Sequence, residues 1–282
     1  MRILVTGAQG RLGSCLVALL SVDYPVVGVD RDVFDITDQA QVQAAWQHHQ
    51  PDLVIHCAAF TQVDEAARQP ELAWRINALG TKHVVLACLA MGSRLLYVST
   101  NEVFDGSNPA GILEYAPAAP INPYGYSKWI GEQFVRDHLQ HFYIVRSSWL
   151  FAHGGNNFVQ AILARARSGQ PLRVVVNEVA SPTYNDDLAV AMVALIKTEQ
   201  YGIYHLVNEG RASRWQLART VLDLAGYAQV EIQRIAAAEY ERASIPPEYS
   251  VLENTMAAAL GIRLRPWEAA LQAYLAREGL LA

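Results

Sequence analysis

The residues best suited to carry chemistry are a tyrosine and a lysine four positions apart, Tyr124 and Lys128. On a helix, residues with this spacing lie on the same face. The ammonium group beside the phenol would favour the phenolate and lower the pKa of Tyr124 from about 10 toward neutrality. Such a phenol can give its proton to a carbonyl oxygen as a hydride arrives, so the pair predicts carbonyl reduction. Tyr126 does not fit this role, because Ile130 stands four residues after it.

A second hydroxyl for the same chemistry stands at Thr100, directly after a predicted strand over 95–99. We expect Thr100 to donate to the carbonyl oxygen. The alternative is a strand-end hydroxyl that caps the following turn.

A glycine-rich turn joins a predicted strand over 3–5 to a predicted helix over 11–20. Glycines at 7, 10 and 13 allow a tight turn, close approach of a pyrophosphate and close packing of the helix on the strand. The start of the helix offers unpaired N–H groups to an anion. In this context the turn predicts a dinucleotide site, and the alternative is an ordinary strand-to-helix turn. The predicted cofactor contacts of this turn are Gly7, Gln9, Gly10, Arg11, Leu12 and Gly13.

Two neighbouring residues give opposite indications about the cofactor. Asp30 ends the second strand about 20 residues after the glycine turn, where a carboxylate binds the ribose hydroxyls of NAD. Arg31 follows directly and would suit the 2′-phosphate of NADP. We therefore expect NADPH or NADH as the cofactor. Asp35 and Ile36 are predicted to lie near the adenine, although Asp35 could equally be a turn or N-cap residue.

These residues need a fold that brings strand ends together, and the sequence predicts one. Strands are expected at 3–5, 26–30, 53–59, 95–99 and 143–147, separated by helices at 11–20, 38–49, 71–90 and 123–138. This alternation predicts an α/β fold, a doubly wound Rossmann parallel sheet with helices on both faces.

The pattern loosens beyond residue 149, where we expect a smaller C-terminal substrate-binding lobe. Helices are predicted at 156–167, 187–197, 213–224 and 266–275, and strands at 172–176 and 203–207. We expect 1–148 to form the NAD(P)-binding domain, with 186–210 returning to it. The lobe would then comprise 149–185 and 211–282.

Composition excludes several classes of protein. The chain has 282 residues, 52% hydrophobic and 17% charged, which is too apolar for a disordered chain. A net charge of −5 argues against a nucleic-acid or membrane-surface partner. The apolar runs are too short to span a bilayer, and no secretory signal is recognised. Cys15, Cys57 and Cys88 suggest free thiols in a reducing compartment, and we expect a cytoplasmic protein.

With these motifs in place, the chain resembles the extended short-chain dehydrogenase/reductases and, among them, the dTDP-4-dehydrorhamnose reductase family. The resemblance runs over nearly the whole chain. It is carried by Thr6–Gly13, Cys57-Ala58-Ala59, Thr61, Val63-Asp64, Asn77, Ser99-Thr100, Val103–Gly106, Asn122–Lys128, Arg146–Trp149, Gly155–Phe158 and Ser181-Pro182-Thr183.

The resemblance implies NAD(P)H-dependent reduction of a 4-keto-6-deoxy sugar carried on dTDP, the last step to dTDP-L-rhamnose. Thr100, Tyr124 and Lys128 would be the catalytic set, and Lys128 would also bind the nicotinamide ribose. Ala58 and Ala59 would line the cofactor. The implied substrate contacts are Thr61, Val63, Asn101, Trp149, Asn157 and Thr183. Trp149 would pack on the deoxysugar; alternatively, its side chain is part of the hydrophobic core.

The chain departs from the family pattern at three places. Asn101-Glu102 stands where the family usually has Asp-Tyr, and Pro246-Pro247 where it carries an arginine. Some members dimerise through a magnesium ion held partly by an acid on the first helix, where this chain has Cys15, so we predict no metal. The departures leave the exact nucleotide sugar open, and both a monomer and a homodimer remain possible.

Two other functions stay open on the sequence. One is a related nucleotide-sugar epimerase or dehydratase with tightly held NAD, for which Glu102 beside Thr100 is the supporting residue. The other is a non-catalytic regulatory subunit on the same fold, against which the intact Tyr124–Lys128 pair argues.

Overall fold

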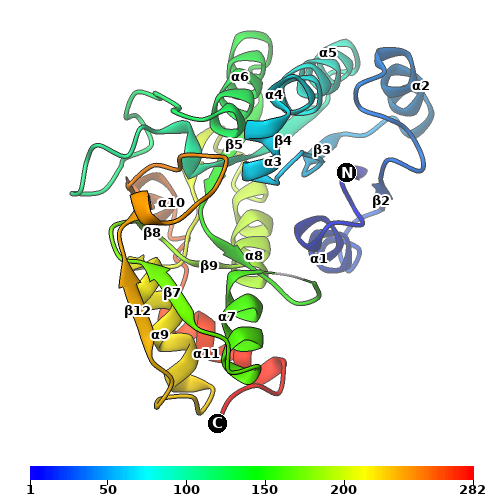
Figure 1. Cartoon of the computed structure of the whole chain (residues 1–282). Helices are drawn as coiled ribbons and strands as arrows, with labels where there is room; N and C mark the ends of the chain where they lie inside the picture. The colour runs from blue at the N-terminus through cyan, green and yellow to red at the C-terminus, as the bar shows by residue number, and fades with distance from the viewer. Residues whose placement is uncertain (156) are drawn as a thin grey trace.

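The centre of the molecule is a six-stranded parallel sheet (Figure 1), seen in a computed structural model that describes residues 1–155 and 157–282. Its strands are β1 (Ile3–Thr6), β2 (Val26–Val29), β3 (Leu53–His56), β4 (Arg94–Thr100), β5 (Phe142–Ser147) and β10 (Gly202–His205), in the order β10-β5-β4-β3-β1-β2. The strand order reverses at β1, which lies between β2 and β3. Ligands of such sheets bind beyond the carboxyl ends of the strands at the point of reversal.

Helices cover both faces of this sheet. On one face, α1 (Arg11–Leu20) and α8 (Asn185–Ile196) bury leucines and small residues against the strands. On the other face lie α2 (Gln39–His49), α5 (Thr81–Met91) and α6 (Pro123–His138). The predicted doubly wound fold is confirmed.

The predicted helix over 71–90 is not one regular helix. It consists of α4 (Pro70–Ala73), a π-helical segment η1 (Trp74–Gly80) and α5, and a short helix α3 (Val63–Arg68) precedes it. The wider turn carries Asn77, whose side chain accepts from Phe60 N at 2.7 Å and donates to Ser127 Oγ at 3.0 Å. Non-local hydrogen bonds therefore interrupt a pattern that is locally helical.

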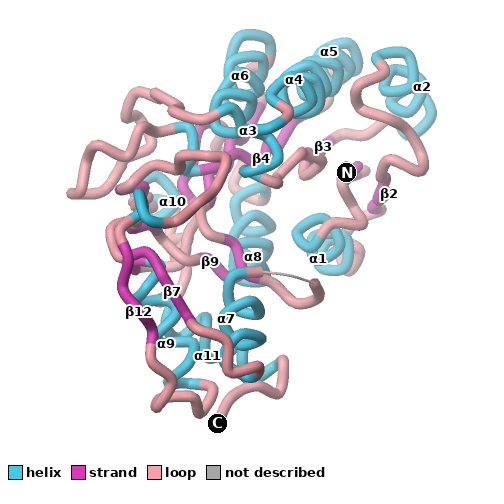
Figure 2. Tube along the Cα trace, in the orientation of Figure 1, coloured by secondary structure: helices cyan, strands magenta, loops and turns pink. Residues whose placement is uncertain are grey.

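The smaller lobe lies below the carboxyl edge of the sheet in Figure 1 and has its own apolar core. Its helices are α7 (Phe158–Arg167), α9 (Arg214–Leu224) and α11 (Trp267–Arg277). The short helix α10 (Thr255–Ala259) packs instead against the core of the six-stranded sheet through Ala257. The strands of the smaller lobe are β6 (Leu150–Phe151), β7 (Leu172–Val175), β8 (Val179–Ala180), β9 (Thr183–Tyr184), β11 (Ala212–Ser213), β12 (Ile232–Ile235) and β13 (Tyr249–Ser250). Figure 2 shows how short these strands are and how much loop connects them. The predicted helix over 156–167 begins at Phe158, and residue 156 lies outside the described residues.

Two helix starts follow from their sequences. Asn122 caps α6 by accepting from Gly125 N at 2.8 Å, and Pro123 occupies the first turn. Ser213 caps α9 in a capping box with Gln216. In the described part of the chain, no helix is long and apolar enough to cross a membrane.

Candidate active site

A large cleft of about 1390 Å³ opens at the carboxyl edge of the sheet, between the sheet and the smaller lobe. Most of the predicted site residues line it: Gly7, Gln9, Gly10, Arg11, Leu12, Gly13, Asp30, Arg31, Asp35, Ile36, Ala58, Ala59, Thr61, Val63, Thr100, Asn101, Tyr124, Lys128 and Trp149. The fold therefore gathers residues from the whole first half of the chain.

The glycine turn closes tightly on itself and on the start of the next loop. Gly7 has φ +68°, and a Cβ there would lie 2.7 Å from Ala58 N. A Cβ on Gly13 would lie 2.2 Å from Gly7 O. Gly10, a residue without a side chain, is the N-cap of α1, and Gly10 to Gly13 line the cleft, so the start of the helix is directed at the cleft. This geometry suits an anion such as a pyrophosphate.

The far end of the cleft carries the residues that indicated the cofactor. Asp30 accepts from Gln9 N at 2.9 Å and from Arg31 N at 2.8 Å. The Arg31 side chain is 85% exposed, and its Nε lies 3.9 Å from Asp35 Oδ2. Asp35 accepts from Thr37 N at 2.8 Å, and this bond lowers the pKa of its carboxyl. Asp35 therefore closes a turn at the cleft wall. Arg75, which the sequence did not indicate, lines the cleft nearby.

The predicted catalytic group is assembled from β4 and α6. Thr100 is the last residue of β4 and lines the cleft together with Tyr124. Its hydroxyl accepts from Glu102 N at 3.2 Å and donates to Asn101 Oδ1 at 3.3 Å, so it caps the following turn, as the alternative interpretation of the sequence expected. Lys128 is 2% exposed, and its Nζ lies 4.1 Å from the centre of the Tyr97 ring. Tyr126 points elsewhere, since it is 48% exposed and contacts Trp129.

The electrostatics of this group differ from the sequence-based expectation. Burial, followed by the Glu102 carboxylate, raises the pKa of Tyr124, against a smaller lowering by the nearby Thr100 hydroxyl. Burial also lowers the pKa of Lys128 to about 7. The expected lowering of the phenol pKa by a lysine cation is therefore wrong for this structure, because desolvation dominates both groups. A phenol that keeps its proton suits a proton donor.

Glu102 is the main group that the sequence analysis left outside the predicted site. It belongs to a 3₁₀ turn, η2 (Asn101–Val103), lines the cleft and is 7% exposed. Asn122 Nδ2 donates to its Oε2 at 2.6 Å. The turn packs tightly on α6, since a Cβ on Gly125 would lie 2.0 Å from Glu102 O. Burial raises the pKa of Glu102 to about 7.

Glu102→Gln is expected to raise the free energy of unfolding at pH 8 by about 3 kcal/mol, with most of the gain absent at pH 5. The pKa of Glu102 rises from 4.5 to about 7 on folding, so the folded state binds this proton more tightly than the unfolded chain. The cost of ionising the buried carboxyl is absent below 4.5, grows up to about 7 and is complete above it. Urea unfolding at several pH values measures this, with exposed Glu71→Gln as control. A pH-independent difference between Glu102→Gln and wild type would contradict it.

Trp149 forms the wall of the cleft on the side of the smaller lobe. Its backbone has φ +42°, a left-handed conformation that is uncommon for a large residue. Its ring is half-buried against the core of the smaller lobe. The Arg214 guanidinium carbon lies 3.6 Å from the ring centre, so a side chain of the protein covers one face of the predicted platform.

Two predicted substrate residues are not part of the cleft lining. Asn157 caps α7 by accepting from Gln160 N at 3.1 Å and donates to Ala152 O at 2.9 Å. Thr183 is fully buried in β9, and its hydroxyl donates to Ser181 O at 3.1 Å. Neither residue is among those that line the cleft. Both side chains are used to hold the smaller lobe together.

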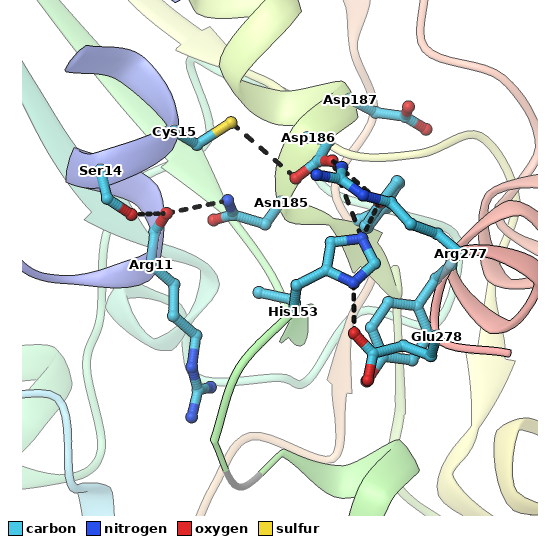
Figure 3. Close-up of polar contacts among 12 residues, drawn as sticks. Arg11, Ser14, Cys15, His153, Asn185, Asp186, Asp187, Arg277 and Glu278 are labelled. Atoms are coloured by element: carbon cyan, nitrogen blue, oxygen red, sulfur yellow. Dashed lines mark hydrogen bonds and ion pairs between the residues drawn. The ribbon is translucent and has the colours of Figure 1, made fainter. Parts of the chain in front are cut away.

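A polar cluster behind the glycine turn joins three helices (Figure 3). Asn185 Nδ2 donates to Arg11 O at 3.2 Å and ties the start of α8 to α1. The Cys15 thiol points toward Asp186 Oδ1 at 3.8 Å, and the same carboxylate accepts from Tyr184 and Arg277. Among the described residues, no group of three or more His, Cys, Asp or Glu could hold a metal ion.

A comparison with known protein families shows which family the chain belongs to. A family model described as the RmlD substrate binding domain matches residues 1–279. The chain belongs to this family. The resemblance indicated by the motifs is confirmed, and the match extends over both the sheet and the smaller lobe.

Individual relatives are similar over almost their full length. The dTDP-4-dehydrorhamnose reductase of Streptomyces griseus is 38% identical over 278 residues, covering 96% of this chain and 91% of that protein. The spore coat polysaccharide biosynthesis protein SpsK of Bacillus subtilis (strain 168) is 36% identical over 275 residues, 97% of this chain and 96% of that protein.

Solved structures agree with these relatives. The crystal structure of dTDP-4-dehydrorhamnose reductase from Bacillus anthracis str. Ames, in complex with NADP, has a TM-score of 0.94 and 37% identity, covering 98% of this chain and 99% of that one. The UDP-glucose 4-epimerase of Thermotoga maritima, at 22% identity and a TM-score of 0.83, shares the fold.

Proposed function

We propose that this chain reduces the 4-keto group of a dTDP-linked 4-keto-6-deoxyhexose with NADPH or NADH, the reaction of dTDP-4-dehydrorhamnose reductases in dTDP-rhamnose biosynthesis. The observation that carries the proposal is that the partly buried Tyr124 lines the same cleft as the glycine turn, together with Thr100 and with Lys128 four residues further along α6. The reductases related to this chain over nearly its whole length support it.

The described residues fit a nicotinamide dinucleotide. The turn at Gly7 and Gly13 admits only glycine, and α1 begins without a side-chain cap. The pyrophosphate would lie on this turn, the adenosine near Asp30 and Arg31, and the nicotinamide ribose near Lys128. Ala58, Ala59 and Ile36 would line the cofactor, as predicted from the sequence. The bound cofactor supplies a hydride to the carbonyl carbon.

The residues of the chain supply the proton and orient the ketone. Tyr124 and Thr100 would both hydrogen-bond the keto oxygen, because both side chains line the same cleft. Tyr124 would give its proton to that oxygen as negative charge develops there. Lys128, on the same face of α6, would then stabilise the phenolate left behind.

We also propose which residues of the cleft contact the substrate. Thr61, Val63, Asn101 and Trp149 line it and would contact the sugar nucleotide. We propose that 1–148 with 186–210 bind the cofactor and that 149–185 with 211–282 bind the substrate. We further propose a cytoplasmic monomer or homodimer that binds no nucleic acid.

The decisive experiment measures NADH and NADPH oxidation by the purified protein with dTDP-, GDP- and UDP-linked 4-keto-6-deoxy sugars. We expect turnover with the dTDP sugar and 4-hydroxy product. No oxidation of either cofactor with any of these sugars would contradict the proposal.

Glu102 favours one second candidate, a nucleotide-sugar epimerase or dehydratase. A buried carboxyl in the cleft, with a pKa of about 7, could exchange a proton with the sugar. Such an enzyme regenerates its cofactor in each cycle and holds NAD tightly. NAD that stays with the protein through chromatography would favour this candidate, whereas cofactor-free protein that oxidises NADPH would favour the reductase.

Arg31→Ala is expected to raise KM for NADPH about 10-fold and to leave KM for NADH nearly unchanged. A guanidinium offsets the repulsion between the Asp30 carboxylate and a 2′-phosphate, and its exposed side chain is free to turn toward that group. Steady-state kinetics with both cofactors measures this, with exposed Arg173→Ala as control. An equal increase in KM for NADH and NADPH would show that Arg31 does not bind the 2′-phosphate.

A further inference from the structure

Two arginines of the smaller lobe share one buried carboxylate next to the cleft. Arg242 donates two hydrogen bonds to Glu178, which is 2% exposed. Arg214 Nε lies 3.7 Å from Glu178 Oε2, beyond hydrogen-bond length for its geometry. The Glu178 carboxylate therefore hydrogen-bonds Arg242, and Arg214 lies beside this pair at a longer distance.

The structure fixes Arg214 in place by its neighbours. It is the first residue of α9, directly after the Ser213 capping box. Its guanidinium carbon lies 3.6 Å from the centre of the Trp149 ring and 5.3 Å from that of Phe158. Arginine stacks on aromatic faces in this way while its in-plane N–H groups remain able to donate. Arg214 lines the cleft with 24% of its side chain exposed.

The donors of Arg214 are not used up within the protein. Among the residues that the structure describes, its Nη atoms donate no hydrogen bond, and its one ion pair is the long contact with Glu178. A guanidinium has five N–H donors. A partly buried guanidinium with unused donors facing a cleft is suited to bind an anion through bidentate hydrogen bonds.

The charge balance of the cluster also favours an anion. Arg214 and Arg242 carry two positive charges, and Glu178 carries one negative charge. An acid that interacts with both arginines is Glu102, whose buried carboxyl has a pKa of about 7 and so is partly protonated near neutrality. Burial lowers the pKa of Arg214 to about 10, which still leaves the guanidinium charged. The cluster therefore presents net positive charge to the substrate side of the cleft.

We infer that Arg214, stacked on Trp149 and backed by Arg242 and Glu178, binds the diphosphate of the nucleotide-sugar substrate. The inference rests on the proposed function for the identity of the ligand. The cofactor pyrophosphate is expected at the glycine turn on β1, whereas Arg214 belongs to the smaller lobe and lies beside Trp149 and near Glu102. Arg214 would thus place the sugar against the Tyr124 end of the cleft.

The test compares two ligands that differ only in the diphosphate. Isothermal titration calorimetry of the NADP⁺-loaded protein measures Kd for dTDP and for thymidine. We expect Arg214→Gln to weaken dTDP binding about 10–100-fold, the effect of losing charge-assisted hydrogen bonds, and to leave thymidine binding unchanged. Arg214→Lys keeps the charge without the planar fork and should recover part of the loss. Arg173→Gln, an exposed arginine of the same lobe, should bind both ligands as wild type does.

The outcomes separate this inference from the proposed function. Wild-type binding of dTDP no tighter than thymidine, or unchanged dTDP binding in Arg214→Gln and Arg214→Lys, would overturn the role of Arg214 even if the ketosugar is reduced. Arg214-dependent binding of dTDP supports the anion site even if no ketosugar is reduced, in which case the proposed reaction fails. If Arg214→Gln unfolds, as melting temperature would show, Arg214→Lys alone decides, and a Kd equal to wild type counts against the inference.

Discussion

Tyr124→Phe is expected to keep the fold and cofactor binding and to lower the rate of ketone reduction about 10²–10⁴-fold. The change removes one oxygen from a partly buried ring, so packing is preserved while the proton donor is lost. Single-turnover oxidation of NADPH with the dTDP ketosugar measures the rate of the chemical step.

Tyr126→Phe is the matched control for this variant. The residue is on the same helix, two positions later, but its ring is exposed and contacts Trp129. It should reduce the ketone at nearly the wild-type rate. If both variants were equally slow, or if Tyr124→Phe were fully active, Tyr124 would not be the acid.

Arg146→Met is expected to lower the free energy of unfolding by about 3–5 kcal/mol. Arg146 on β5 makes two hydrogen bonds to Glu132 on α6, at 2.9 and 2.6 Å, and both side chains are almost fully buried. Removing the arginine leaves a buried carboxylate whose remaining hydrogen bond, among the described residues, comes from Ser99 Oγ at 2.5 Å. The uncompensated charge, rather than the lost pair itself, causes the destabilisation. Urea unfolding at pH 7 measures it.

Two further variants test that explanation. The double variant Arg146→Met/Glu132→Leu removes both charges and should recover much of the stability. Lys197→Met breaks the exposed pair with Asp23 and should cost about 1 kcal/mol or less. A double variant no more stable than Arg146→Met would show that packing, not the buried charge, explains the loss.

Short segments with local signals were predicted well from the sequence. The helix over 11–20 has the predicted bounds, and so does the helix over 123–138, which begins at the Asn122 cap. A cap, a proline in the first turn and apolar periodicity act within a few residues of one another, so they can be read without the fold. The helical spacing of Tyr124 and Lys128 follows from the same local rules.

Segments whose conformation depends on distant partners were predicted less well. The region 71–90 is helical by pattern, but Asn77 bonds to Phe60 and Ser127 in a π-helical turn. The strand expected over 53–59 ends at His56, because the following residues pass directly against Gly7. Such contacts are set by packing between elements and leave no periodic trace in the sequence.

The sequence by itself determined the α/β class, the dinucleotide turn and the Tyr124–Lys128 pair, because each depends on residue types at short, fixed spacings. Only the tertiary structure brought Glu102, Trp149 and Arg214 to one end of the cleft and left Asn157 and Thr183 out of its lining. It also decided the direction in which the pKa of Tyr124 moves. Burial and charge proximity are properties of the packed chain, and desolvation outweighs the pairwise attraction that spacing alone suggests.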